Sequence, residues 1–178
     1  MSIGRSFAES IQKGFSSLDY GLDGIDTPKN IFWTKRNILK ELKKQSSERL
    51  LIIAESLRMG ISKKKINKIT NYDPWFIDQI DAIIKLEKNI SNYKLNKENL
   101  LYLKSRGFSD KKIAKLKNKK EAYIRNLRHK YNIKPVYRLV DTCAGEFDSK
   151  TPYLYSTYDW KLENNKFCES NPSNRKKI

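Results

Sequence analysis

The chain contains two copies of one helical pattern, 47 positions apart. Residues 60–69, Gly-Ile-Ser-Lys-Lys-Lys-Ile-Asn-Lys-Ile, align with residues 107–116, Gly-Phe-Ser-Asp-Lys-Lys-Ile-Ala-Lys-Leu, and the match continues without a gap to Ile80 and Leu127. Each copy is predicted as a helix, a Gly-apolar-Ser turn, a short helix, a turn and a longer helix. Two copies are too few for a solenoid. The repeat therefore predicts an all-α fold, a compact multi-helix domain with two helical-hairpin repeats.

Helix-start and helix-stop residues flank the apolar patterns. Ser6 and Glu9 form a capping-box signature, and Asp73 with Pro74 is a helix start. Gly60 suits the left-handed residue that ends many helices. The predicted helices lie within residues 2–20 and at about 34–44, 47–59, 62–69, 73–90, 97–106, 110–117 and 120–131.

The first predicted helix is amphipathic. Phe7, Ile11, Phe15 and Leu18 recur at helical spacing along it. Two glycines and a proline follow within residues 21–28, and such residues interrupt regular structure. We therefore expect this helix to be detached from the helices that come after it.

Two apolar groups are candidates for the core. The run at residues 50–54 is apolar nearly all round, so its helix is expected at the centre. Trp75 and Phe76 share a helix face with Ile80 and Ile83. Core packing is the default interpretation of these two aromatic residues, and a binding surface is the alternative.

Beyond the helices the pattern becomes extended. Residues 135–140 are the best strand candidate, and residues 151–158 alternate small polar residues with tyrosine. In an extended segment Tyr153 and Tyr155 share one side and Tyr158 falls on the other. We expect an extended strap here that docks on a neighbour.

The chain is strongly basic, since 28 Lys and 9 Arg against 20 acidic residues give a formal charge of +17. Nucleic-acid binding is one interpretation. The favoured interpretation is solvated lysines on helix surfaces, because nucleic-acid sites usually prefer clustered arginine. Residues 113–128 resemble a helix-turn-helix that would present Arg125, Arg128 and Lys130. The unit lacks a base-reading set of Arg, Asn and Gln side chains.

Few residues suggest cofactor or catalytic chemistry. Two cysteines and one histidine are too few for a disulfide scaffold or a tetrahedral metal site, and no glycine-rich phosphate loop is present. A nucleophilic Cys143 would need a base, and His129 is elsewhere in the sequence, so a small buried cysteine is expected. Asp141 and Glu146 are either a carboxylate pair for acid–base work or partners of local groups. No run approaches the roughly 20 apolar residues of a membrane span.

Several motifs together resemble one known family. The segments that carry the resemblance are residues 1–5, 9–13, 58–62, 73–77, 106–110 with Ile113-Ala114, 135–138, 140–147, 151–153, 155–158, 171–173 and 175–178. They come in family order over nearly the whole chain, and Asp141–Phe147 and Thr151–Tyr158 are the most specific. The sequence resembles the middle of the large subunit of glutamine-hydrolysing carbamoyl phosphate synthase.

The resemblance implies a division of the chain into three parts. That large subunit has two ATP-grasp halves with an all-helical oligomerisation domain between them. Residues 1–26 would be the closing helix of the preceding half, 27–140 the helical oligomerisation domain, and 141–178 an extended exit strap and linker to the second half. Residues 176–178 would begin the first strand of that half. The chain is then expected to be a fragment of a longer protein.

The resemblance also implies a role without catalysis. The family's nucleotide, metal and bicarbonate ligands lie in the ATP-grasp halves, so no catalytic residue, cofactor or metal is expected in this segment. The parent would be a cytoplasmic ligase that uses ATP with Mg or Mn, and K. It would make carbamoyl phosphate from bicarbonate, glutamine-derived ammonia and two ATP, for arginine and pyrimidine biosynthesis.

The expected partners are the two flanking ATP-grasp halves, other large subunits and the glutaminase small subunit, with no nucleic acid and no membrane. The alternatives are a basic helix-turn-helix-like nucleic-acid-binding domain and a ligase active on its own. We expect structural or interface roles for Trp75, Phe76, Asp141, Glu146, Phe147, Tyr153, Tyr155 and Tyr158.

Overall fold

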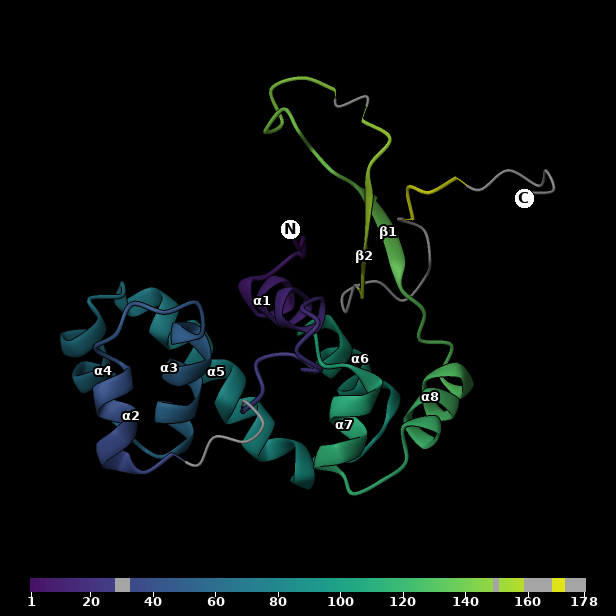
Figure 1. Cartoon of the computed structure of the whole chain (residues 1–178). Helices are drawn as coiled ribbons and strands as arrows, with labels where there is room; N and C mark the ends of the chain where they lie inside the picture. Colours follow the sequence, from purple (N-terminus) through teal and green to yellow (C-terminus); the bar gives the residue numbers. More distant parts are fainter. Residues whose placement is uncertain (28–32, 149–150, 159–167, 172–178) are drawn as a thin grey trace.

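The computed structural model describes residues 1–27, 33–148, 151–158 and 168–171. These residues form a mostly helical structure with one two-stranded sheet, which confirms the all-α class (Figure 1). All of the predicted helices are present near their predicted positions. They are α1 (Phe7–Ser16), α2 (Lys35–Glu41), α3 (Arg49–Arg58), α4 (Lys63–Thr70), α5 (Pro74–Asn89), α6 (Lys97–Ser105), α7 (Asp110–Leu116) and α8 (Glu121–Lys130), with a 3₁₀ turn, η1, at Ile90–Asn92.

The two repeats share their backbone turns. Gly60 and Gly107 both have positive φ, 78° and 86°, directly after α3 and α6. The serine two residues after each glycine caps α4 or α7 by accepting a backbone N–H. Asn71 and Asn118 then adopt left-handed φ angles of 57° and 50° after those short helices. Equivalent turns at equivalent positions confirm the two helical-hairpin repeats.

The hydrophobic core runs through both repeats. In α3 the buried side chains are Leu51, Ile52, Ile53, Ala54, Ser56 and Leu57, which confirms the central position predicted for this helix. Ile113 of α7 is fully buried as well. Figure 1 shows α2–α5 as one group and α6–α8 as a second, with α1 lying over both.

The expectation that the first helix is detached is wrong. Gln12 of α1 donates a hydrogen bond to the carbonyl oxygen of Arg106, at the end of α6 (2.8 Å). The helix also passes directly over Gly107, where a Cβ atom would lie 3.0 Å from the Cα of Glu9. The glycines after α1 make a turn that brings the chain back to the helices, with φ 125° at Gly24, rather than a spacer.

The two predicted extended segments pair with each other. β1 (Val136–Leu139) and β2 (Leu154–Thr157) are antiparallel, with Val136 opposite Thr157 and Leu139 opposite Leu154. Figure 1 shows this hairpin projecting from the helices on the side of α1 and the N-terminus. The predicted strap therefore contributes one strand, β2, to a hairpin. The end of this hairpin at Val136 and Thr157 is packed against the helical body.

The division into residues 1–26, 27–140 and 141–178 stays a prediction. Residues 149–150, 159–167 and 172–178 of the predicted strap and linker lie outside the described residues. No helix among the residues placed by the structure is both long and apolar enough to cross a membrane.

Candidate docking interface

A buried carboxylate fixes the hairpin to α1. Glu9 is 1% exposed, and its Oε2 accepts hydrogen bonds from the hydroxyl of Thr157 (2.9 Å) and the backbone N–H of Arg5 (2.8 Å). Its Oε1 lies 2.7 Å from Nζ of Lys13, and that ammonium also donates to the carbonyl oxygen of Ser156. Neither Glu9 nor Thr157 was recognised as an interface residue from the sequence, because they are 148 positions apart.

The hairpin has one packed and one open face. Val136 and Thr157 face each other across the ladder and are buried. On the opposite face Tyr137, Leu139 and Leu154 are 44%, 40% and 40% exposed. Large apolar side chains exposed side by side are typical of an interaction surface.

The outer edge of β1 is covered by residues 168–171. The backbone N–H of Glu169 donates to the carbonyl oxygen of Tyr137 (2.8 Å), and the Glu169 carboxylate accepts from the N–H of Leu139 (2.6 Å). The same carboxylate lies 3.2 Å from the guanidinium of Arg138. This cover satisfies backbone groups that an open strand edge would leave unpaired.

The structure brings three of the expected interface residues together. Asp141, Glu146 and Phe147 line one hollow of about 560 Å³ at the far end of the hairpin. Phe147 is 75% exposed, and Tyr153 in the returning segment is 68% exposed. The Asp141 carboxylate accepts the backbone N–H of Cys143 (2.9 Å), so it shapes this loop.

The other two tyrosines are closer to the helical body. Tyr155 is half-buried, and Tyr158 is half-buried with its ring 5.1 Å from Nζ of Lys104. Burial raises the pKa of Tyr158. Tyr158 therefore contacts α6, and its expected docking role stays a prediction. Cys143, expected to be buried, is also only half-buried because it lies in the loop beyond β1.

The default expectation that Trp75 and Phe76 lie in the core is wrong. They are 51% and 41% exposed, and together with Phe7 of α1 they form a surface aromatic patch. The ring of Trp75 meets that of Phe7 edge-on, with centroids 5.5 Å apart. It meets the ring of Phe76 in the same way, with centroids 4.9 Å apart. They start α5, and it is the following turns of this helix that enter the core, through Ile80 and Ile83.

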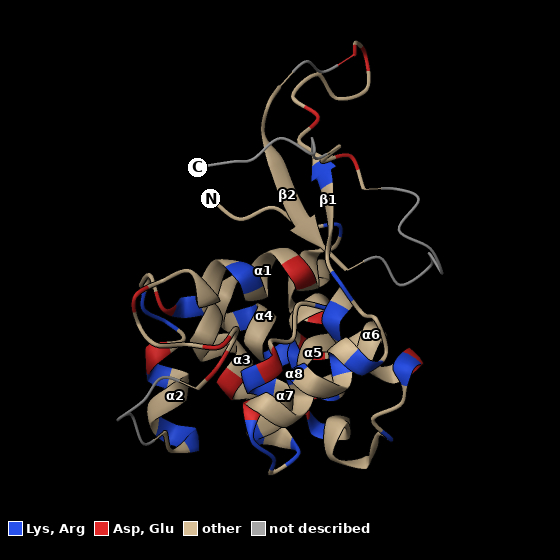
Figure 2. Ribbon diagram, turned by 90° about the vertical axis from the view of Figure 1, so that its right-hand side faces the viewer, with Lys and Arg blue, Asp and Glu red and all other residues tan. Residues whose placement is uncertain are grey.

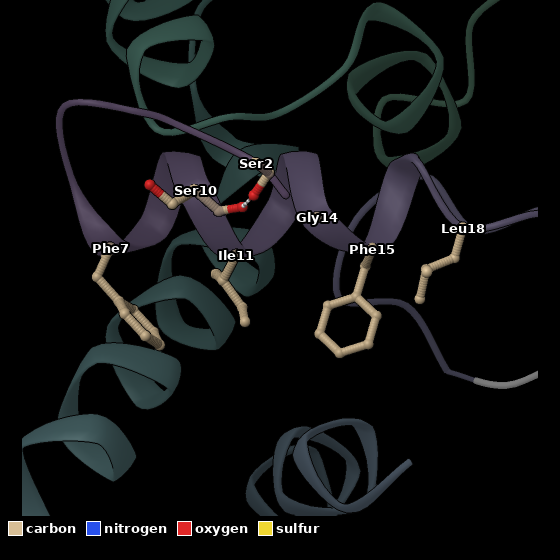
Figure 3. A pocket seen from close by; sticks show the side chains of 7 residues that line it. All are labelled: Ser2, Phe7, Ser10, Ile11, Gly14, Phe15 and Leu18. Carbon is tan, nitrogen blue, oxygen red and sulfur yellow. Dashed lines mark hydrogen bonds between the residues drawn. The ribbon is translucent and has the colours of Figure 1, made fainter. Parts of the chain in front are cut away.

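An apolar groove continues from the aromatic patch along α1. It encloses about 320 Å³ and is lined by the helix stripe noted in the sequence together with small residues (Figure 3). Leu18 at its end is 43% exposed. In the sequence, the amphipathic stripe of α1 was the feature that could have indicated this groove. Its lining residues are Ser2, Phe7, Ser10, Ile11, Gly14, Phe15 and Leu18.

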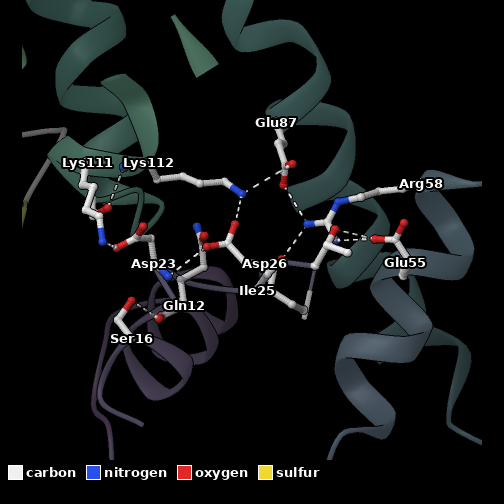
Figure 4. A network of polar contacts seen from close by, with 12 residues as sticks. Gln12, Ser16, Asp23, Ile25, Asp26, Glu55, Arg58, Glu87, Lys111 and Lys112 are labelled. Atoms are coloured by element: carbon white, nitrogen blue, oxygen red, sulfur yellow. Dashed lines mark hydrogen bonds and ion pairs between the residues drawn. The ribbon is translucent and has the colours of Figure 1, made fainter. Parts of the chain in front are cut away.

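Next to α1, a buried ionic network joins the two repeats (Figure 4). Lys112 of α7 is 4% exposed and pairs with Asp26, and its Nζ lies 3.5 Å from a Glu87 oxygen of α5. The other Glu87 oxygen lies 2.9 Å from the Arg58 guanidinium of α3. Arg58 also donates to the carbonyl oxygen of Ile25 (2.5 Å), so the segment that follows α1 is held between the repeats.

The network lowers the pKa of its central carboxylate. Burial by itself would raise the pKa of Asp26, but the charge and hydrogen bond of Lys112 hold it below the ordinary value of 3.8. In α7 the pKa of Asp110 is also lowered against the effect of burial, by Lys104 and Arg128. Both carboxylates are thus partners of internal cations.

The basic residues of the helix-turn-helix-like unit are partly engaged inside the chain. Arg128 lies 3.1 Å from Asp110, and Arg125 lies 2.5 Å from Glu121. Figure 2 shows basic and acidic residues interspersed over the helices. Ion pairs of this kind do not support the nucleic-acid interpretation. Among the residues that the structure describes, no group of three or more His, Cys, Asp or Glu could hold a metal ion.

Comparison with known proteins identifies the family. Residues 1–132 match the family model described as carbamoyl-phosphate synthetase large chain, oligomerisation domain. The whole chain is 44% identical to part of the carbamoyl phosphate synthase large chain of Buchnera aphidicola, 42% to that of Vibrio cholerae and 41% to that of Methanosarcina acetivorans. It spans 16% of the length of each of these relatives. The chain therefore belongs to the carbamoyl phosphate synthase large-chain family and contains its oligomerisation domain.

Proposed function

We propose that the chain is the oligomerisation and spacer module of a carbamoyl phosphate synthase large subunit. In this proposal it holds two flanking ATP-grasp halves at a fixed spacing and joins large subunits to each other. The observation that carries the proposal is the match of residues 1–132 to the oligomerisation domain of the family. In this proposal the catalytic residues and cofactor ligands lie in the two halves, and residues 1–26 and 141–178 lead to them.

The activity belongs to the parent enzyme. That enzyme would be a cytoplasmic ligase, with a glutaminase small subunit, that uses ATP with Mg or Mn, and K, to make carbamoyl phosphate for arginine and pyrimidine biosynthesis. Carbamate formed in one half must reach the other half without meeting water. A rigid module between the halves serves that need because it fixes the distance between the two sites.

The hairpin is the proposed contact with the flanking halves. Its open face carries Tyr137, Leu139 and Leu154, and Phe147 and Tyr153 are two further exposed aromatic side chains beyond the strands. Aromatic side chains at the centre of an interface usually contribute most of the binding free energy. The hairpin also projects away from the helices, so it can reach a neighbouring body (Figure 1).

Truncating this surface is expected to uncouple the parent enzyme. In the complete large subunit, Phe147→Ala or Tyr153→Ala should raise the ATP consumed per carbamoyl phosphate severalfold, up to about tenfold, because misplaced halves lose carbamate to water. The two rates are measured in parallel on the purified enzyme. Tyr123→Ala, at an exposed α8 tyrosine, is the matched control. Normal coupling in both hairpin variants would contradict the docking role.

The aromatic patch is the proposed contact between two copies of the large subunit. Phe7, Trp75 and Phe76 are uncharged and continue into the apolar groove of α1. A second chain of charge +17 is repelled by most of the surface, so an uncharged patch is where two copies approach at least cost. The patch and groove lie next to each other, as a two-fold contact between identical surfaces requires.

Trp75→Ala is expected to weaken self-association by about 30-fold, the loss typical of a central aromatic residue. The substitution is structurally mild, because the second repeat already has Ala122 at the equivalent position. Sedimentation velocity over a concentration series measures the effect. Tyr123 occupies the position equivalent to Phe76 and is 49% exposed, so Tyr123→Ala is again the control. An unsubstituted chain that stays monomeric at every concentration would contradict the proposed contact. An equal loss of self-association in Trp75→Ala and Tyr123→Ala would contradict it as well.

A further inference from the structure

The N-terminal arm folds back along α1. The hydroxyl of Ser2 donates to the carbonyl oxygen of Ser10 (2.6 Å), and the carbonyl oxygen of Ile3 accepts from Nζ of Lys13 (3.2 Å). A Cβ atom on Gly4 would lie 3.0 Å from the backbone N of Ser10, so the arm touches the helix along its length. The chain that leads into the domain is thus held against α1.

Strand β2 contacts α1 at the side chains of Glu9 and Lys13. Thr157 donates its hydroxyl to Glu9, and Ser156 accepts from Lys13, the residue that also holds the arm. Thr157 is 1% exposed, as is Glu9. Residues from both ends of the domain are therefore joined through one ion pair, between the buried Glu9 and the partly exposed Lys13.

Glu9 is chemically suited to this position. A carboxylate has two acceptor oxygens and a full negative charge, and here it faces the Arg5 N–H, the Thr157 hydroxyl and the Lys13 ammonium. An amide of the same shape has only one acceptor oxygen. If the glutamine oxygen keeps the hydrogen bonds from Arg5 and Thr157, its NH2 group faces the Lys13 ammonium. If the amide is turned the other way, those two donors lose their acceptor, so either orientation loses contacts that hold the arm or the strap.

We propose that Glu9 is a positioning residue that locks the incoming arm to the outgoing strap. The lock rests on the proposed spacer function, because it makes the flanking segments leave the helical domain in a fixed mutual geometry. Release of either segment would let the two flanking bodies move relative to each other. The predicted capping box is confirmed in its Ser6 half, because the Ser6 hydroxyl accepts the backbone N–H of Glu9 (3.2 Å), whereas the Glu9 side chain accepts the N–H of Arg5 at the arm.

Amide hydrogen exchange of the 178-residue chain, read residue by residue by NMR, tests the lock. In Glu9→Gln we expect protection to fall about tenfold both at Arg5 and in the β1–β2 ladder, while the amides of α3–α8 change less than about twofold. Glu121→Gln removes an exposed glutamate that pairs with Arg125 and should leave all three regions unchanged. Unchanged protection at Arg5 and the ladder in Glu9→Gln would overturn the proposal. Equal loss in every helix would overturn it too, because it would show general destabilisation.

Thr157 supplies a second test that does not alter α1. Thr157→Val removes the hydroxyl at nearly constant shape and should lower protection in the ladder and at Arg5, whereas Thr157→Ser keeps the hydroxyl and should retain it. A loss of amide protection in the β1–β2 ladder without a loss at Arg5 would show that the N-terminal arm and the strap are not coupled. Sedimentation of the same samples is independent of this readout, so failure of the lock and failure of self-association are distinguished.

Discussion

Gly107→Ala is expected to destabilise the chain by about 3 kcal/mol. Part of the loss is backbone strain, because φ at Gly107 is +86° and an L-residue there costs roughly 1–2 kcal/mol. The rest is steric: the new methyl group would lie 3.0 Å from the Cα of Glu9 and 3.3 Å from the carbonyl oxygen of Ala8. Both are backbone atoms, so α1 itself must move, and overpacking of this kind typically costs roughly 1–3 kcal/mol. Urea unfolding followed by circular dichroism measures the change.

The repeat supplies the matched control. Gly60 is the equivalent glycine of the first copy, with φ +78°, but a Cβ there meets nothing within 4 Å. Gly60→Ala should therefore cost only the strain, about 1–2 kcal/mol. Equal losses at the two glycines would mean that α1 does not pack on the Gly107 turn in solution.

Lys112→Met is the second substitution with a large expected effect, a loss of about 3–4 kcal/mol. Lys112 is 4% exposed and is the cation that pairs with Asp26. Without it the Asp26 carboxylate stays buried, and within the part of the chain that the structure describes it accepts only the backbone N–H of Asp23 (2.8 Å). Breaking one partner of a buried ion pair usually costs several kcal/mol because the remaining charge is uncompensated.

The neighbouring residue provides the control for this variant. Lys111 lies 3.1 Å from Asp23, but its side chain is 60% exposed. Lys111→Met should change the free energy of unfolding by less than about 1 kcal/mol, as for other exposed ion pairs. A Lys112→Met protein as stable as Lys111→Met would show that the network contributes little.

The pH dependence gives an independent check on the same pair. Lys112 lowers the pKa of Asp26 in the folded chain, so the stabilisation is present above the unfolded value of about 3.8 and is lost as the pH falls below it. In Lys112→Met, burial would raise the pKa of Asp26, so protonation favours the folded state. The difference in stability between the two proteins should therefore shrink from about pH 5 to about pH 2. A constant difference would contradict the pairing.

Local features of the fold could be predicted residue by residue. Ser62 and Asp73 cap helices, Gly60 is left-handed, and each repeat contains its predicted helices. These features depend on neighbours within four residues, through hydrogen bonds that the backbone and a nearby side chain make together. The resemblance to the family also rested on local motifs, and the comparison confirmed it.

The candidate interface was only partly predictable. Phe147 and Tyr153 are exposed and Tyr158 is half-buried beside Lys104, and the docking role expected for all three stays a prediction. Trp75 and Phe76 were expected in the core because their spacing matches that of Ile80. Helical spacing shows which residues share a face, but not how far along the helix the packing partner reaches.

What the sequence by itself determined is the set of elements: the repeated helices, their caps and turns, and two extended segments near the end. The tertiary structure alone decided that α1 lies over Gly107, that β1 pairs with β2, and that Glu9 holds Thr157. The physical reason is range. Caps and periodicity are set by contacts between near neighbours, whereas the difference between Gly60 and Gly107 depends on which distant segment packs above each turn.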